Sequence, residues 1–153
     1  SSGIHSNGYS LIRTILKKNK LNKNLKRELL RPTKIYSKEI IKLSEKNLIN
    51  AAAHITGGGL IDNLIRSIPK NLCANIDLSK IKIKKIFKWI KKNDVSEKEM
   101  IKTFNCGVGF CLIVPKYNVQ KIRKYFTKDF MPYEIGYISK NNKKFKLMNS
   151  LQW

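Results

Sequence analysis

The chain has 153 residues, of which 42% are hydrophobic, and it carries a formal net charge of +22. This length suits a single domain with a real core, and the apolar content excludes a disordered basic tail. No apolar run approaches the roughly 20 residues of a membrane-spanning helix, so we expect no membrane association. The sequence therefore predicts one globular domain over residues 1–153.

Amphipathic spacing predicts a first helix over residues 9–18. A glycine turn at Gly8 opens it, and Asn7 is available as its cap. The polar, lysine-rich stretch 19–28 is interpreted as a connector. A second helix is expected to be capped near Ser37. It is expected to run through Ile41, Ser44 and Leu48.

Strands and helices alternate in the middle of the chain. The short apolar segment 51–55 ends at a glycine triplet and is predicted to be a strand, and helical spacing resumes over 60–69. A strand is expected over 72–78. Apolar residues at helical spacing within the basic stretch 80–92 predict a surface helix whose lysines face solvent. A capping-box sequence then begins a short helix over 96–104.

The last third of the chain contributes three expected strands and one helix. The continuous apolar run 110–114 predicts a central strand buried on both faces. A helix is expected over 118–127, followed by strands over 132–139 and 144–148 on either side of an Asn-Asn turn. The fold class that follows is α/β (α+β), with a mixed β-sheet flanked by helices.

The three cysteines favour a reducing, cytoplasmic location. Their number is odd and no CxxC spacing occurs, so the sequence supports neither a disulfide framework nor a zinc site. We expect them to be buried and structural, and a nucleophilic Cys106 is the alternative. They are Cys73, Cys106 and Cys111.

The positive charge by itself suggests a nucleic-acid-binding protein. However, 27 of the 32 basic residues are lysines and they are spread along the whole chain, whereas base recognition favours the arginine fork. We interpret the charge as a solvated surface and do not expect specific nucleic-acid binding. A basic nucleic-acid-binding module is kept as the alternative function.

Two polar segments, each headed by a histidine, predict one anion-binding site. The three glycines have no side chains, so their backbone N–H groups can approach and bind a phosphate at the start of a helix. The imidazoles can supply directed polar contacts to the same ligand. A ligand-free turn with structural histidines fits the same residues. The aspartates of the sequence do not form a cluster of the kind that binds a metal ion, so no metal site is predicted. The candidate site residues are His5, Ser6, Asn7, His54, Thr56, Gly57, Gly58, Gly59, Asn105 and Gly107.

Four strings carry a more specific signal. They are SGIHSNGYSL at 2–11, LRPTKIY at 30–36, HITGGG at 54–59 and EMIKTFNCGVG at 99–109. In this order and spacing they resemble the C-terminal half of the aminoimidazole ribonucleotide synthetase family, the phosphoribosylformylglycinamidine cyclo-ligases. The resemblance runs from Ser1 to about Ile138. The chain departs from the family pattern at four positions: Lys34, Ile61, Ile65 and Phe110.

The resemblance implies an ATP- and Mg²⁺-dependent ligase of purine biosynthesis, a cytoplasmic homodimer in its full-length form. Such an enzyme closes the imidazole ring of formylglycinamidine ribonucleotide to give aminoimidazole ribonucleotide, ADP and phosphate. By analogy, His5 and His54 contact the reacting substrate, and Thr56 with the glycine triplet binds a phosphate. Asn7 and Asn105 add polar contacts.

The resemblance also implies that part of the enzyme is absent. In the family an N-terminal domain carries the acidic Mg·ATP motifs, and none of these occurs in this chain. We therefore expect the chain alone to be inactive, with ATP and Mg²⁺ bound mainly by the missing domain. A related ATP-dependent member of the same superfamily is a further alternative.

Overall fold

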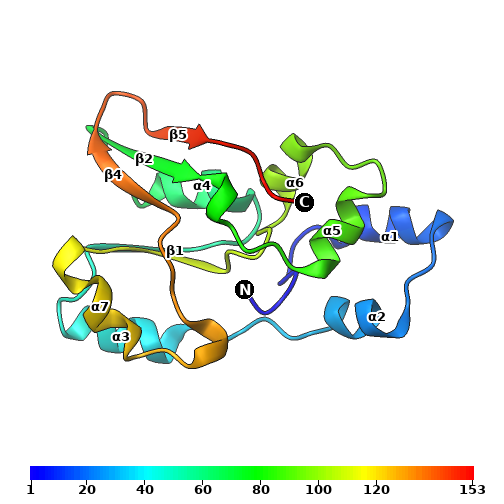
Figure 1. The fold of residues 1–153 in the computed structure, drawn as a ribbon, viewed down its shortest axis with the longest axis horizontal. Coiled ribbons are helices and arrows are strands. Elements are labelled where there is room, and N and C mark those ends of the chain that lie inside the picture. The colour runs from blue at the N-terminus through cyan, green and yellow to red at the C-terminus, as the bar shows by residue number, and fades with distance from the viewer.

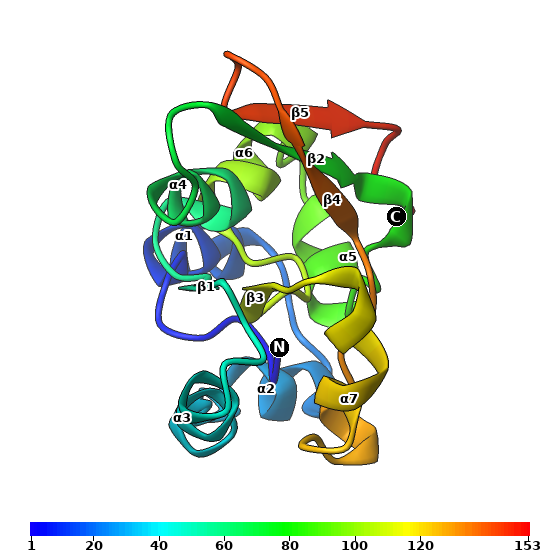
Figure 2. The same ribbon diagram turned by 90° about the vertical axis from the view of Figure 1, so that its left-hand side faces the viewer.

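The computed structural model describes residues 1–153, which form seven helices and two small sheets (Figures 1 and 2). This confirms the predicted α/β class. The helices are α1 (Tyr9–Lys18), α2 (Lys23–Leu29), α3 (Ser37–Glu45), α4 (Gly59–Arg66), α5 (Lys85–Lys91), α6 (Glu97–Thr103) and α7 (Val119–Arg123). The strands are β1 (Ala51–His54), β2 (Leu72–Asp77), β3 (Phe110–Ile113), β4 (Gly136–Lys140) and β5 (Phe145–Met148).

The larger sheet is mixed and has β2 at its centre. Its order is β4-β2-β5, with β4 antiparallel and β5 parallel to β2. β1 and β3 form a separate antiparallel pair. In both views this pair lies between the three-stranded sheet on one side and α2, α3 and α7 on the other (Figures 1 and 2). The β1–β3 pair thus runs through the middle of the domain.

One strand prediction, for the apolar run 110–114, is wrong. The run 110–114 was expected to be a central strand, but β3 has β1 as its only strand neighbour. The expected burial on both faces is not met either, because only Cys111 of this strand is buried. The strands expected on either side of the Asn-Asn turn form as β4 and β5, and β2 lies between them and bonds to both.

The helix predictions need three corrections. The stretch 19–28 is not a plain connector, because it contains most of α2, which Asn22 caps by accepting a hydrogen bond from Leu25 N at 2.9 Å. α3 ends at Glu45, short of Leu48, and its buried side chain is Leu43. Asn7 does not cap α1, whose N-cap residue is Gly8, in the left-handed region and without a side-chain cap.

Half of the predicted capping box forms at α6. Ser96 Oγ accepts a hydrogen bond from Glu99 N at 3.1 Å, as expected. The Glu99 carboxylate instead accepts a hydrogen bond from Thr103 one turn later, so it does not return to the cap. The basic helix is shorter than predicted, with Ile86, Phe87 and Ile90 buried in α5.

One hydrophobic cluster connects all the layers. It includes residues from α1, β1, α4, β2, α5, α6 and β3. The prediction that the three cysteines are buried is confirmed. Burial raises the pKa of both Cys106 and Cys111 to about 12, so neither thiol is poised as a nucleophile at neutral pH.

The surface is dominated by unpaired lysines. Lys34 and Glu39 form the single side-chain ion pair, with Nζ and Oε1 2.7 Å apart. No helix combines the length and apolar character needed to cross a bilayer.

Candidate functional site

The β1–β3 ladder places His54 next to an aromatic ring. His54 at the end of β1 is directly opposite Phe110 at the start of β3. Opposed side chains of an antiparallel pair lie on the same face and touch. The two rings stack, with centroids 5.4 Å apart and planes 19° from parallel. His54 itself remains exposed to solvent.

The loop before α1 brings the second histidine to the same place. His5 has a φ of 62°, in the left-handed region that non-glycine residues rarely adopt, and its side chain is only 4% exposed. Its ring centroid lies 5.9 Å from that of His54. The two candidate histidines, 49 positions apart, therefore share one site.

Tyr36 completes a cluster of four rings with His5, His54 and Phe110. Its ring meets His54 edge-on at 5.6 Å and Phe110 at 5.2 Å. Its hydroxyl lies 3.5 Å from His5 Nε2. Gly109 makes this packing possible, because a Cβ there would overlap the Tyr36 hydroxyl and lie 2.7 Å from His5 Cε1.

Both histidines are neutral at pH 7. Burial lowers the pKa of His5 to about 4, and the nearby amino terminus and His54 add to the effect, while a backbone contact with Ile55 opposes it. Partial burial also lowers the pKa of His54. A neutral, exposed imidazole can accept a proton from a ligand, so His54 is suited to be the proton carrier.

We predict that acidification destabilises the domain through His5. Because the folded-state pKa of about 4 lies below the model value of 6.5, the unfolded chain binds the proton more tightly. The stabilisation is present above pH 6.5 and is lost as the pH falls towards 4, by on the order of 2 kcal/mol. Urea unfolding at several pH values measures this slope.

His5→Asn is the control for this measurement. Asparagine tolerates the left-handed backbone that His5 adopts, and it does not titrate. The variant should show a shallower fall in unfolding free energy between pH 6.5 and 4 than the unmodified chain. Equal slopes for the two proteins would contradict the buried, neutral state of His5.

The glycine triplet forms a tight turn into α4. Gly58 has a φ of 88° and Gly59 a φ of 63°. Asn63 holds the turn from within the helix, since its Nδ2 donates to Gly57 O at 2.9 Å and to Gly59 O at 2.7 Å. Its Oδ1 lies 3.4 Å from Thr56 Oγ1, which can donate to it. The turn is therefore pre-formed without a ligand.

The same turn offers donors for an anion. The backbone N–H groups of Gly57 and Gly58 have no hydrogen-bond partner in the protein, and the positive end of the α4 dipole faces the turn. Asp62 in the first turn of α4 opposes this, because its exposed carboxylate lies beside Gly58. A phosphate at this helix end must therefore approach from the Gly57 side.

Asn7 connects the two polar segments. Its Oδ1 lies 3.5 Å from the position that a Cβ on Gly57 would take, and its Nδ2 donates to Thr103 O at 2.6 Å. Ser6 beside it is exposed, with no hydrogen-bond partner for its hydroxyl in the protein. The structure thus brings the loop that carries His5 and Asn7 against the glycine triplet.

Asn105 and Gly107 lie behind this surface. Asn105 is 3% exposed, and its side-chain amide is hydrogen-bonded to backbone groups. Its Nδ2 donates to Gly3 O at 2.8 Å and to Ile4 O at 3.2 Å, and its Oδ1 accepts from Gly107 N at 2.9 Å. This geometry matches the ligand-free turn interpretation of Asn105. The pair fixes the loop that carries His5.

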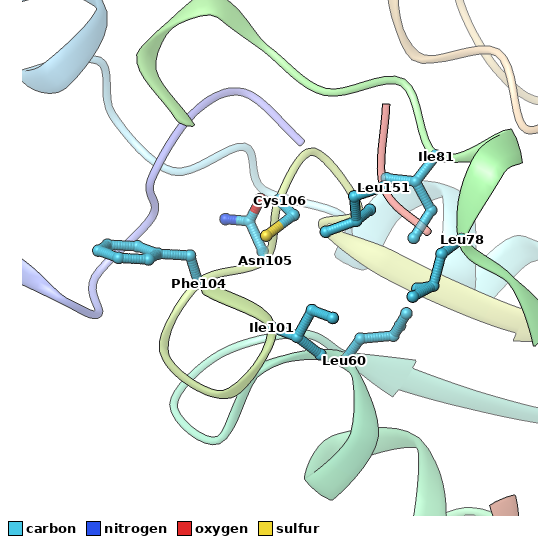
Figure 3. A pocket seen from close by; sticks show the side chains of 8 residues that line it. All are labelled: Leu60, Leu78, Ile81, Ile101, Phe104, Asn105, Cys106 and Leu151. Carbon is cyan, nitrogen blue, oxygen red and sulfur yellow. The ribbon is translucent and has the colours of Figure 1, made fainter. Parts of the chain in front are cut away.

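A small apolar pocket lies behind the polar site. It has a volume of about 10 Å³ and is lined by Asn105 and seven apolar residues: Leu60, Leu78, Ile81, Ile101, Phe104, Cys106 and Leu151 (Figure 3). It is too small for more than one water molecule. The candidate site is instead an open surface, and no cluster of three or more potential metal ligands lies in the domain.

Sequence reasoning missed two residues of the site. Tyr36 lies in the LRPTKIY string, but nothing in the spacing indicated that it would reach His5. Asn63 lies in a helical stripe, where a buried polar residue among apolar neighbours was the available signal.

Comparisons with known proteins support the sequence resemblance. Residues 1–147 match the family described as "AIR synthase related protein, C-terminal domain". A phosphoribosylformylglycinamidine cyclo-ligase from Fusobacterium nucleatum is 43% identical, over 93% of this chain and 45% of its own length. One from Ligilactobacillus salivarius is 42% identical, over 92% and 44%. The trifunctional purine biosynthetic protein adenosine-3 of Gallus gallus is 40% identical, over 99% and 17%. The chain spans less than half the length of these relatives.

Proposed function

Because the chain belongs to the family of AIR synthase related proteins, as their C-terminal domain, we propose that it forms the substrate-facing half of a cyclo-ligase. The reaction is the ATP-dependent ring closure of formylglycinamidine ribonucleotide to aminoimidazole ribonucleotide. One observation carries the proposal: the histidine segments and the glycine turn, distant in sequence, meet on one surface through Asn7. ATP and Mg²⁺ are bound mainly by a further domain, and the assembled enzyme is a cytoplasmic homodimer.

The residues of the site fit the parts of this reaction. ATP phosphorylates the formyl oxygen, which turns it into a good leaving group, and a substrate nitrogen then attacks the activated carbon. His54 accepts the proton that this nitrogen loses, since its imidazole is neutral and exposed. The glycine turn and Thr56 hold a phosphate, and Ser6 and Asn7 hold polar atoms of the substrate. Catalysis here is positioning plus electrostatic stabilisation.

His5 has a different role in this proposal. Its ring is almost fully buried and its low pKa disfavours protonation near pH 7. It shapes the wall against which His54 and the substrate lie. Asn105 and Gly107 act behind it by fixing the loop.

Calorimetric titration with formylglycinamidine ribonucleotide tests the phosphate site. We expect binding to the chain, and we expect Asp62→Asn to tighten it several-fold. Removing a unit charge about 4 Å from a phosphate is worth about 1 kcal/mol in water. Asp94→Asn, an exposed aspartate between α5 and α6, is the matched control. Equal affinities for the two variants would exclude a phosphate at the glycine turn.

The same sample distinguishes the enzyme from the nucleic-acid alternative. The chain alone should neither hydrolyse ATP nor form the aminoimidazole product. Measurable turnover would contradict the division of the active site between two domains. Absence of ribonucleotide binding, together with duplex DNA binding that falls steeply between 50 mM and 200 mM salt, would favour a basic nucleic-acid-binding module.

A further inference from the structure

Tyr36 supplies the polar side-chain contact of the His5 ring, and the backbone of Ile55 is the other polar group near this ring. Its hydroxyl is 3.5 Å from His5 Nε2, and His5 Nδ1 is buried without a partner. The position of the hydroxyl is tightly constrained, because it lies against the backbone of Gly109, where no Cβ fits. The ring of Tyr36 is held from the other side by Phe110. This tyrosine has little freedom to move away from His5.

A neutral imidazole carries one proton, on either Nδ1 or Nε2, and its partners decide which. In the free side chain the Nε2–H form predominates. His5 differs because its Nε2 faces a hydroxyl that can donate. A hydroxyl that donates to Nε2 leaves the proton on Nδ1.

The surroundings of Tyr36 make it the donor in this contact. Burial, with a smaller contribution from Glu39, raises the pKa of Tyr36 to about 12, so its hydroxyl keeps its proton. This hydroxyl has no other hydrogen-bond partner in the protein, neither a backbone carbonyl nor a carboxylate. The nearest carboxylate, Glu39, is occupied by Lys34. The hydroxyl proton is therefore available to His5.

We infer that Tyr36 is a positioning residue of the proposed site: its hydroxyl donates to His5 Nε2 and thereby keeps the His5 proton on Nδ1. Its ring also holds His54 edge-on, with the two planes 60° apart. Tyr36 thus acts through both histidines, and His54 is the one that stays open to a ligand. This role rests on the proposed function for its purpose, whereas the His5 tautomer is a property of the chain alone.

Nitrogen NMR of the ¹⁵N-histidine-labelled chain tests the inference. With only two histidines, long-range ¹H–¹⁵N correlations resolve both rings, and His54→Asn assigns them. We expect His5 to show a protonated Nδ1 and a bare Nε2 at pH 7. Tyr36→Phe deletes only the hydroxyl, and it should move His5 to the Nε2–H form or to a mixture of both.

Tyr9→Phe is the matched control, since the Tyr9 hydroxyl donates to Leu29 O at 2.8 Å and does not touch either histidine. It should leave the tautomer unchanged. Protonation of Nε2 in the unmodified chain would overturn the inference, even if Tyr36→Phe fails to fold. An unchanged Tyr36→Phe spectrum would overturn it as well. Failure of the ribonucleotide to bind in the separate titration would instead count against the proposed function.

Discussion

Replacing Gly59 with alanine is expected to prevent stable folding or to cost about 3 kcal/mol or more. A Cβ at this position would overlap the carbonyl oxygen of Ile101, a backbone atom that cannot turn aside as a side chain can. The residue also has a φ of 63°, which alanine adopts only with strain. Because α4 and α6 pack at this point, the damage should spread through the core. Urea unfolding followed by circular dichroism measures the loss.

Gly57→Ala is the matched control within the same triplet. Its Cβ would lie 3.5 Å from Asn7 Oδ1, which is ordinary van der Waals contact, and its φ is not in the left-handed region. We expect a change of less than about 1 kcal/mol in unfolding free energy. Similar losses for both variants would show that close packing of α4 on α6 is not what requires Gly59.

Replacing Asn105 with alanine should cost about 3–5 kcal/mol. The change leaves the buried carbonyl of Ile4 and the buried N–H of Gly107 without partners, and it leaves the Gly3 carbonyl with the Ser1 hydroxyl alone. It also enlarges the small apolar cavity beside Asn105. The free energy of unfolding in urea is the measurement, and weakened ribonucleotide binding should accompany the loss, because the freed loop carries His5.

Asn93→Ala removes a comparable amide from a less demanding place. Asn93 Nδ2 donates to Trp89 O at 2.7 Å near the C-terminal end of α5, where the carbonyl remains close to water. We expect a loss of about 0.5–1.5 kcal/mol. If Asn105→Ala cost no more than this control, the buried amide would not be what fixes the loop.

Helices and strands with a regular spacing of apolar residues were predictable from the sequence, whereas the pairing of the strands was not. The helix from Tyr9 and the strands beginning at Ala51 and Leu72 lie close to where the pattern put them. α2 was not predicted because its few apolar residues are separated by lysines and asparagines, although Asn22 is a residue type that commonly caps helices. The insertion of β2 between β4 and β5 depends on tertiary packing, which local turn signals do not encode.

The candidate site was predictable as strings of residues but not as an arrangement. The histidines and the glycine turn could be recognised as candidate site residues because these residue types together are typical of an anion-binding site. The contact of Tyr36 with His5 spans 31 positions and depends on a glycine, Gly109, from a third segment. Asn105 was ambiguous because an amide before a glycine serves a turn and a ligand equally well in sequence. Only its three backbone bonds distinguish the two.

The strand order β4-β2-β5 also has a consequence during synthesis on the ribosome. Asn75 in β2 bonds to Tyr137 in β4, 62 positions later, and β5 is made later still. β2 therefore emerges with both of its edges open and waits for partners while α5, α6 and β3 are translated. An unpaired apolar strand is the kind of segment that associates with other nascent chains. Slow translation between residues 78 and 136 would lengthen this exposure and lower the yield of folded protein.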